Sequence, residues 1–199
     1  MPAALRALLW GERVAPALGG DYVSSNLSRL RARLQSRSKP YVLDLGPMSA
    51  PSLRQLLALG CHLHCEHPTE PGAAPDDSYD PAAALWKYRF PSAFFDAVLL
   101  WDLYDYLPAP AALRFSGSLR AMLAPGGLIH ALLRPKSGAK RAHIHRFELE
   151  PEPGRFSAAA LEPTLACYPH AELRPLFPGL RLLHRQHHPG GLRDLLLGL

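Results

Sequence analysis

The stretch Tyr41–Gly46, with the sequence YVLDLG, is the most informative feature of this chain. It predicts a short apolar strand that carries one acid, Asp44, near its end and a glycine at its exit. Pro51 then marks the start of a helix. A strand that opens through glycine into a helix N-terminus is a typical ligand-binding device. Glycine lets the backbone approach a ligand closely, and the free N–H groups of the helix attract polar or anionic groups.

Length and composition indicate a globular protein with one sizeable core. The chain has 199 residues, of which 48% are hydrophobic and 20% charged, and no apolar run approaches the roughly 18–20 residues that a membrane span needs. Three cysteines, an odd number, favour a reducing compartment, so we expect a cytoplasmic protein without a membrane partner. The net charge of +5 permits an anionic partner but does not require one, because the arginines are spread along the chain.

Strands alternate with helices along the chain, which predicts an α/β layered sheet. We expect residues 1–24 to form a leader and residues 25–199 a single domain. The last two strands are joined by a short turn and must therefore be antiparallel. Residues 134–156 are expected to form a long polar and basic connection. Helices are predicted at 25–37, 50–59, 81–88, 110–123 and 171–177, and strands at 41–45, 62–65, 95–102, 128–133, 180–184 and 192–197.

Four motifs in order resemble those of the class I S-adenosylmethionine (SAM)-dependent methyltransferases. Leu43–Gly46 (LDLG) matches the first half of the family's hydrophobic-Leu-Asp-hydrophobic-Gly-x-Gly-x-Gly motif, and Glu66 follows Asp44 by 22 positions, as does the acid that closes the family's second strand. Tyr88–Leu103 resembles the Leu-Pro-Phe-Pro-x-x-x-Phe-Asp segment and the fourth strand, and Leu123–Gly127 (LAPGG) resembles the turn before the fifth. The resemblance covers roughly residues 25–199.

The resemblance implies a Rossmann-like three-layer sandwich with a mostly parallel sheet and a C-terminal antiparallel strand. The stretch between Glu66 and Phe95 is too rich in loop residues for a full helix–strand–helix unit, so the sheet is expected to lack one edge strand. The dinucleotide fingerprint G-x-G-x-x-G is absent from the first motif, and SAM is therefore the expected cofactor.

The resemblance also implies which residues hold the cofactor. Asp44 is expected to hold the amine of SAM, directly or through water, and Gly46 to let the backbone approach. Glu66 is expected to accept hydrogen bonds from the ribose hydroxyls. No general base can be named. The other residues expected along the cofactor are Pro47, Met48, Asp102, which would edge the pocket, and Leu103.

Three departures from the family pattern keep two functions open. Met48 and Ala50 replace the second and third glycines of the first motif, and Ala84 stands where the family often has an acid near the adenine. One function is a SAM-dependent methyltransferase that acts on an unidentified, small-molecule acceptor. The alternative is a catalytically inactive, methyltransferase-like module that binds a partner protein or serves as a scaffold. The acid at Asp102 has a second interpretation too, as a helix cap or a hydrogen-bonded loop acid.

Two further stretches contain residue types that occur in binding sites. Cys61–His67 (CHLHCEH) is dense in metal-ligand residues, but its cysteines and first two histidines alternate between strand faces and cannot close around one zinc, so no metal is expected. Residues 134–146 are basic and follow a strand end, which motivates an RNA-binding or RNA-modifying domain as a weaker alternative; a solvated loop is the simpler interpretation. His130, inside a strand, is expected to be a hydrogen-bonded core histidine.

Overall fold

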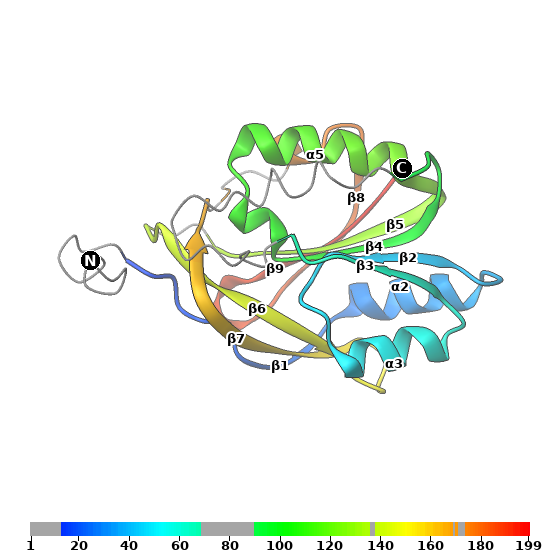
Figure 1. The fold of residues 1–199 in the computed structure, drawn as a ribbon, viewed down its shortest axis with the longest axis horizontal. Helices are drawn as coiled ribbons and strands as arrows, with labels where there is room; N and C mark the ends of the chain where they lie inside the picture. Colours follow the sequence, from blue (N-terminus) through cyan, green and yellow to red (C-terminus); the bar gives the residue numbers. More distant parts are fainter. Residues whose placement is uncertain (1–12, 69–89, 136–137, 169, 171–173) are drawn as a thin grey trace.

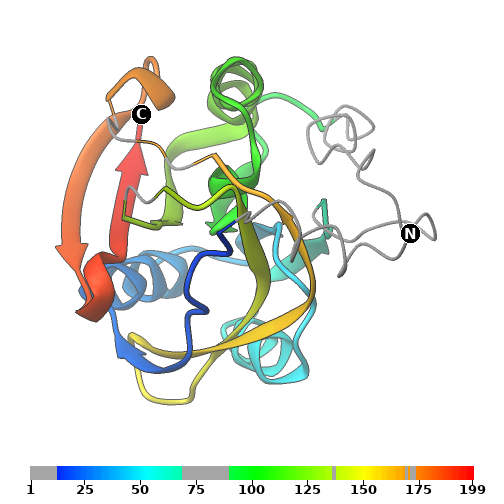
Figure 2. The same cartoon turned by 90° about the vertical axis from the view of Figure 1, so that its left-hand side faces the viewer.

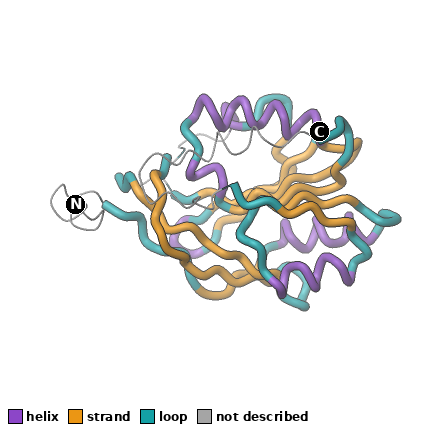
Figure 3. The backbone as a smooth tube through the Cα atoms, viewed as in Figure 1, coloured by secondary structure: helices purple, strands orange, loops and turns teal. Residues whose placement is uncertain are grey.

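The computed structural model describes residues 13–68, 90–135, 138–168, 170 and 174–199. Its centre is a six-stranded sheet with helices on both faces (Figures 1 and 3). β2 pairs in parallel with β3 and β4, β4 pairs in parallel with β5, and β9 runs antiparallel to both β5 and β8. In order across the sheet the strands are β3 (His62–Cys65), β2 (Tyr41–Asp44), β4 (Phe95–Trp101), β5 (Leu123–Leu133), β9 (Arg193–Gly198) and β8 (Arg181–His187).

This architecture confirms the predicted three-layer, mostly parallel fold with a C-terminal antiparallel strand. Within the part of the chain that is described, β3 forms one edge of the sheet. The predicted helix at 81–88 and most of the predicted loop at 67–80 lie outside the described residues. β4 has six of its seven residues buried because helices cover both of its faces, which is why its sequence reads as a continuous apolar run.

Two helices cover one face and one covers the other (Figure 1). α2 (Ser25–Gln35) begins at Ser24, whose hydroxyl accepts the N–H of Leu27, and it buries three leucines at helical spacing. α3 (Ala50–Ala58) lies on the same side of the sheet, and α5 (Ala109–Met122) lies on the opposite side. Each face thus has its own apolar cluster, one under α5 and one under α2 and α3.

A second, three-stranded antiparallel sheet was not expected from the sequence. Its order is β1 (Gly20–Val23), β7 (Arg155–Ala166) and β6 (Arg141–Leu149), and Figures 1 and 2 place β6 beside α3. The prediction that 134–156 is a polar connection was therefore wrong over residues 141–149 and 155–156, which belong to β6 and β7. Basic and apolar residues alternate from Arg141 to His145, and the apolar members of this period-two pattern, Ala142 and Ile144, are buried. Phe147, three residues beyond Ile144, is buried in the other apolar cluster of this side.

The C-terminal part of the prediction is confirmed with small shifts in the boundaries. The two last strands pair antiparallel, as β8 and β9. Of the helix predicted at 171–177, residues 171–173 lie outside the described residues, and Arg174–Leu176 form a single 3₁₀ turn. No helix among the described residues is long and apolar enough to cross a membrane.

Candidate functional site

The strand–glycine–helix unit forms as the sequence predicts. β2 ends at Asp44, the chain turns through Gly46, and α3 begins after Ser49, whose hydroxyl accepts the N–H of Ser52 at 3.5 Å. Pro51 stands in the first turn of the helix, where its missing N–H costs nothing.

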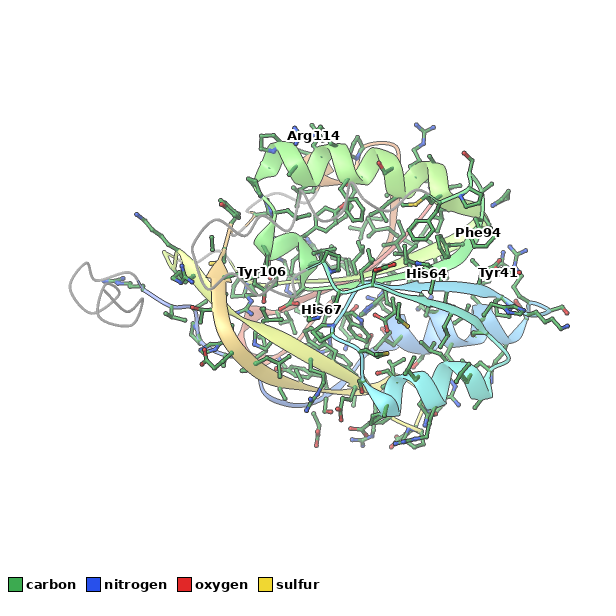
Figure 4. All side chains as sticks on the ribbon, viewed as in Figure 1. Tyr41, His64, His67, Phe94, Tyr106 and Arg114 are labelled. Atoms are coloured by element: carbon green, nitrogen blue, oxygen red, sulfur yellow. The ribbon has the colours of Figure 1, made fainter. Side chains whose placement is uncertain are left out.

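The register of three parallel strands brings the predicted acids to one edge of the sheet. Asp44 is the partner of Cys65 in β3 and of Leu99 in β4, and the N–H of Glu66 donates to the Asp44 carbonyl at 2.8 Å. The structure therefore places Asp44, Gly46 and Glu66 together. In Figure 4 the labelled residues His67 and Tyr106 lie near this carboxyl end of the strands. Tyr41, the first residue of β2, marks the opposite end of the sheet.

The carboxylate of Asp44 already has two donors from the chain itself. The indole N–H of Trp101 donates to its Oδ1 at 2.7 Å, and the backbone N–H of Gly46 donates to the same oxygen at 3.0 Å. The residue is 8% exposed. Burial raises the pKa of Asp44 to about 6, and the two hydrogen bonds only partly offset this effect.

Trp101 fills the space over Gly46. A Cβ atom added to Gly46 would lie 2.4 Å from Cδ1 and 2.8 Å from Nε1 of the indole, which is far inside van der Waals contact. The indole is 2% exposed and stacks on Phe147 of β6, with ring centres 5.0 Å apart and planes 5° apart. Gly46 is thus needed for the close approach of a side chain of the same protein.

The two halves of the predicted cofactor site differ in their fit to SAM. Glu66, predicted to hold the ribose, keeps a 24% exposed side chain and contacts His64 at 2.9 Å. The side chain of Met48 is 67% exposed, and its neighbour Pro47 is partly exposed. The Asp44–Gly46 half, expected to hold the amine of SAM, is covered by the indole of Trp101.

Sequence reasoning missed Trp101, although a signal was present. The residue stands at the exit of the fourth strand, directly before Asp102, where the family resemblance places residues near the cofactor. A large aromatic residue near a turn that requires glycine indicates that its ring and a ligand compete for the same space over the glycine.

Asp102 lies in a buried polar network. Its carboxylate is 2.8 Å from Nδ1 of His145 and accepts the hydroxyl of Tyr106 at 2.9 Å, with Arg134 at 3.4 Å. The N–H of Leu18 donates to Nε2 of His145 at 2.9 Å, and Nη2 of Arg134 lies 2.7 Å from Nδ1 of the same ring. Burial opposes ionisation, but His145 and Arg134 outweigh it and hold the pKa of Asp102 below its usual range.

This network attaches the second sheet to the central one. It joins β6, through His145, to the exits of β4 and β5, where Asp102 and Arg134 lie. Nearby, burial and the charge of Asp102 raise the pKa of Asp105 to about 7. Leu103, predicted along the cofactor, is buried in the apolar cluster under α5.

Two further residues singled out in the sequence, Arg134 and His130, are buried and paired. Arg134, the first residue of the basic stretch, is buried against Asp102 and Asp105 and does not reach solvent. His130 is fully buried and bonded to Asp194 at 3.0 Å, which confirms the predicted core histidine. Among the described residues, no three metal-ligating side chains come together.

The comparisons with known proteins extend the fold assignment. No family model and no curated protein matches this chain. Among solved structures, the CcbJ methyltransferase of Streptomyces caelestis is 16% identical, with 86% of this chain and 93% of that chain covered at a TM-score of 0.51. The PH0226 protein of Pyrococcus horikoshii OT3 is 11% identical, covering 82% and 83% at a TM-score of 0.50. At such identities the likeness concerns the fold, and the chain has the class I SAM-dependent methyltransferase fold.

Proposed function

We propose that this chain is a SAM-dependent methyltransferase-like protein that binds its cofactor at the carboxyl ends of β2 and β3 and methylates an unidentified small-molecule acceptor. One observation carries the proposal: the strand register sets Asp44 and Glu66 side by side around the Gly46 turn, in a fold shared with a methyltransferase. A cytoplasmic location is part of the proposal, because the three cysteines are free thiols.

Each of the three residues has one role in binding. Glu66 accepts hydrogen bonds from the ribose hydroxyls, and Gly46 allows the backbone to approach the cofactor. Asp44 can accept the amine only after Trp101 has moved away from it. SAM supplies the activated methyl group, and the protein's contribution is to bind and orient the reactants.

A second candidate function is favoured by the indole over Gly46. A site filled by its own side chain suits a catalytically inactive module that keeps the methyltransferase fold as a scaffold or for partner binding. The two candidates differ in one measurable property, the affinity for SAM and for S-adenosylhomocysteine (SAH).

The first experiment compares thermal unfolding with and without SAM and SAH. Ligand at about 100 times its dissociation constant adds about 2.7 kcal/mol to the free energy of unfolding. For a chain of this length that corresponds to a rise in Tm of roughly 5–10 °C. We expect such a rise, and we expect Glu66→Gln to abolish it. If neither the wild type nor Trp101→Ser responds to millimolar SAH, the methyltransferase proposal is wrong and the scaffold candidate replaces it.

A further inference from the structure

We propose that Trp101 is a built-in occupant of the SAM site: its indole lies where the methionine end of the cofactor belongs and takes the place of the amine as the donor to Asp44. SAM then binds only in the fraction of molecules in which the indole has left Gly46. This inference rests on the proposed function, since it concerns the same site.

The contacts of the indole match those expected of the ligand. The cofactor's amine would donate to Asp44, and the indole N–H donates to that carboxylate at 2.7 Å. The cofactor would lie close to the backbone of Gly46, and the indole lies so close that a Cβ atom there would be only 2.4 Å from Cδ1. One side chain therefore both donates to the carboxylate of Asp44 and fills the space against the backbone of Gly46.

The second sheet holds the indole in place. Phe147 of β6 stacks on one face of the ring, and Phe156 of β7 lies 6.3 Å from it between ring centres. The ring of His130 is nearly perpendicular to the indole, with the ring centres 5.7 Å apart. The buried network around Asp102 and His145 ties β6 to the exit of β4, one residue beyond Trp101. Occupancy of the site is thus linked to the docking of the second sheet.

The backbone at Trp101 has an unusual conformation. Its φ is 49°, in the left-handed region that bulky residues adopt rarely. Lys39 and Ala93 also have positive φ, but both are exposed, whereas Trp101 is buried. Such conformations persist only where the surrounding structure imposes them. Here the conformation accompanies an indole that points onto Gly46.

A side chain that occupies a ligand site lowers the apparent affinity by the fraction of open molecules. Removing the indole must therefore tighten ligand binding, which is the reverse of what loss of a ligand-contacting residue does. Trp101→Ser removes the ring, and Trp101→Phe keeps an aromatic ring over Gly46 but cannot donate to Asp44. Phe115→Ala is the matched control, because it opens space in the other apolar cluster, under α5.

The test measures SAH affinity by calorimetric titration of the full-length protein and the three variants, with circular dichroism to show that each is folded. We expect Trp101→Ser to bind SAH at least about tenfold more tightly than the wild type. We expect Trp101→Phe to lie between these two and Phe115→Ala to equal the wild type. Equal affinity in the wild type and Trp101→Ser would overturn the inference while leaving the proposed function intact.

A second measurement does not depend on the folding of the serine variant. The wild type is labelled with 5-fluorotryptophan, and the ¹⁹F resonance of Trp101 is assigned among the chain's three tryptophans by its absence in Trp101→Phe. Saturating SAH is expected to shift this resonance as the indole leaves. If SAH binds and the resonance stays in place, the inference is wrong. If SAH binds to no folded form of the protein, the proposed function fails and the inference fails with it.

Discussion

Asp44 and Glu66 lie at the ends of neighbouring parallel strands of one sheet, yet their side chains differ in solvent exposure and in hydrogen-bond partners. Asp44 is 8% exposed and accepts hydrogen bonds from Trp101 and from the Gly46 backbone. Glu66 keeps a 24% exposed side chain, which contacts the exposed His64, and its backbone N–H donates to the carbonyl of Asp44. The strand pattern decides where each acid lies, whereas the side chains that pack over it decide whether a ligand can reach it.

The second sheet causes this difference. β6 and β7 lie on the side of α2 and α3 and bring Phe147 against Trp101, which in turn covers Asp44. Glu66, at the end of the outermost described strand on that edge, is not among the residues of this cluster. Predictions that separate buried from accessible acids therefore test the account directly.

The largest effect is expected from Asp102→Ala, since it removes the centre of the network that attaches the second sheet. The substitution leaves Arg134 and His145 buried without their shared carboxylate. We expect a loss of about 3–5 kcal/mol in the free energy of unfolding, measured by urea denaturation. A loss below about 1 kcal/mol would mean that the network does not hold the two sheets together.

The next effect is the pH dependence contributed by Asp44. The raised pKa of about 6 means that the folded chain binds more protons than the unfolded chain between roughly pH 4 and 6, so the contribution of Asp44 to stability falls as pH rises through that window. Asp44→Asn lacks this titration. Its stability relative to the wild type should rise from pH 4 to pH 7, by up to about 3 kcal/mol. Asp105 is present in both proteins, so its contribution to the pH dependence of stability cancels in the comparison. A constant difference between the two proteins would show that Asp44 is not desolvated as described.

A smaller effect is expected from Gly46→Ala, and it depends on Trp101. In the wild type the added methyl group meets the indole and should cost about 1–3 kcal/mol. In the Trp101→Ser background the cost should fall to about 0.5 kcal/mol or less, because the indole is gone. A double-mutant cycle in urea measures the difference. An equal loss in the free energy of unfolding in the two backgrounds would show that the indole does not lie against Gly46.

The smallest effect on stability is expected from Glu66→Gln. Because its exposed contact with His64 contributes little, the free energy of unfolding should change by less than about 0.5 kcal/mol. Affinity for SAH should nevertheless fall, since the ribose loses a charged acceptor. Calorimetry on the Trp101→Ser background gives the clearest comparison. Unchanged affinity there would remove Glu66 from the site.

The sequence was informative wherever local pattern and geometry coincide. YVLDLG predicted β2, the Gly46 turn and the start of α3, and the family resemblance implied that Asp44 and Glu66 lie at one site. These features depend on strand ends and turns within short segments. The terminal antiparallel pair followed from the short turn between its strands.

The rest depended on contacts between distant parts of the chain. The period-two pattern of β6 was hidden among histidines and arginines, so the sheet that packs on Trp101 was not predicted. The position of the indole depends on Phe147, on Asp44 and on an unusual backbone conformation at Trp101 itself, none of which a single sequence specifies. Met48 is expected along the cofactor, and its side chain is exposed.

The most direct measurement is hydrogen exchange of the Trp101 indole N–H in ¹⁵N-labelled protein, with and without SAH. We expect slow exchange in the free protein, because the N–H is buried and bonded to Asp44. We expect saturating SAH to remove this protection as the indole leaves Gly46. Fast exchange in the free protein, or protection that persists with SAH bound, would contradict the central claim that Trp101 occupies the cofactor's place.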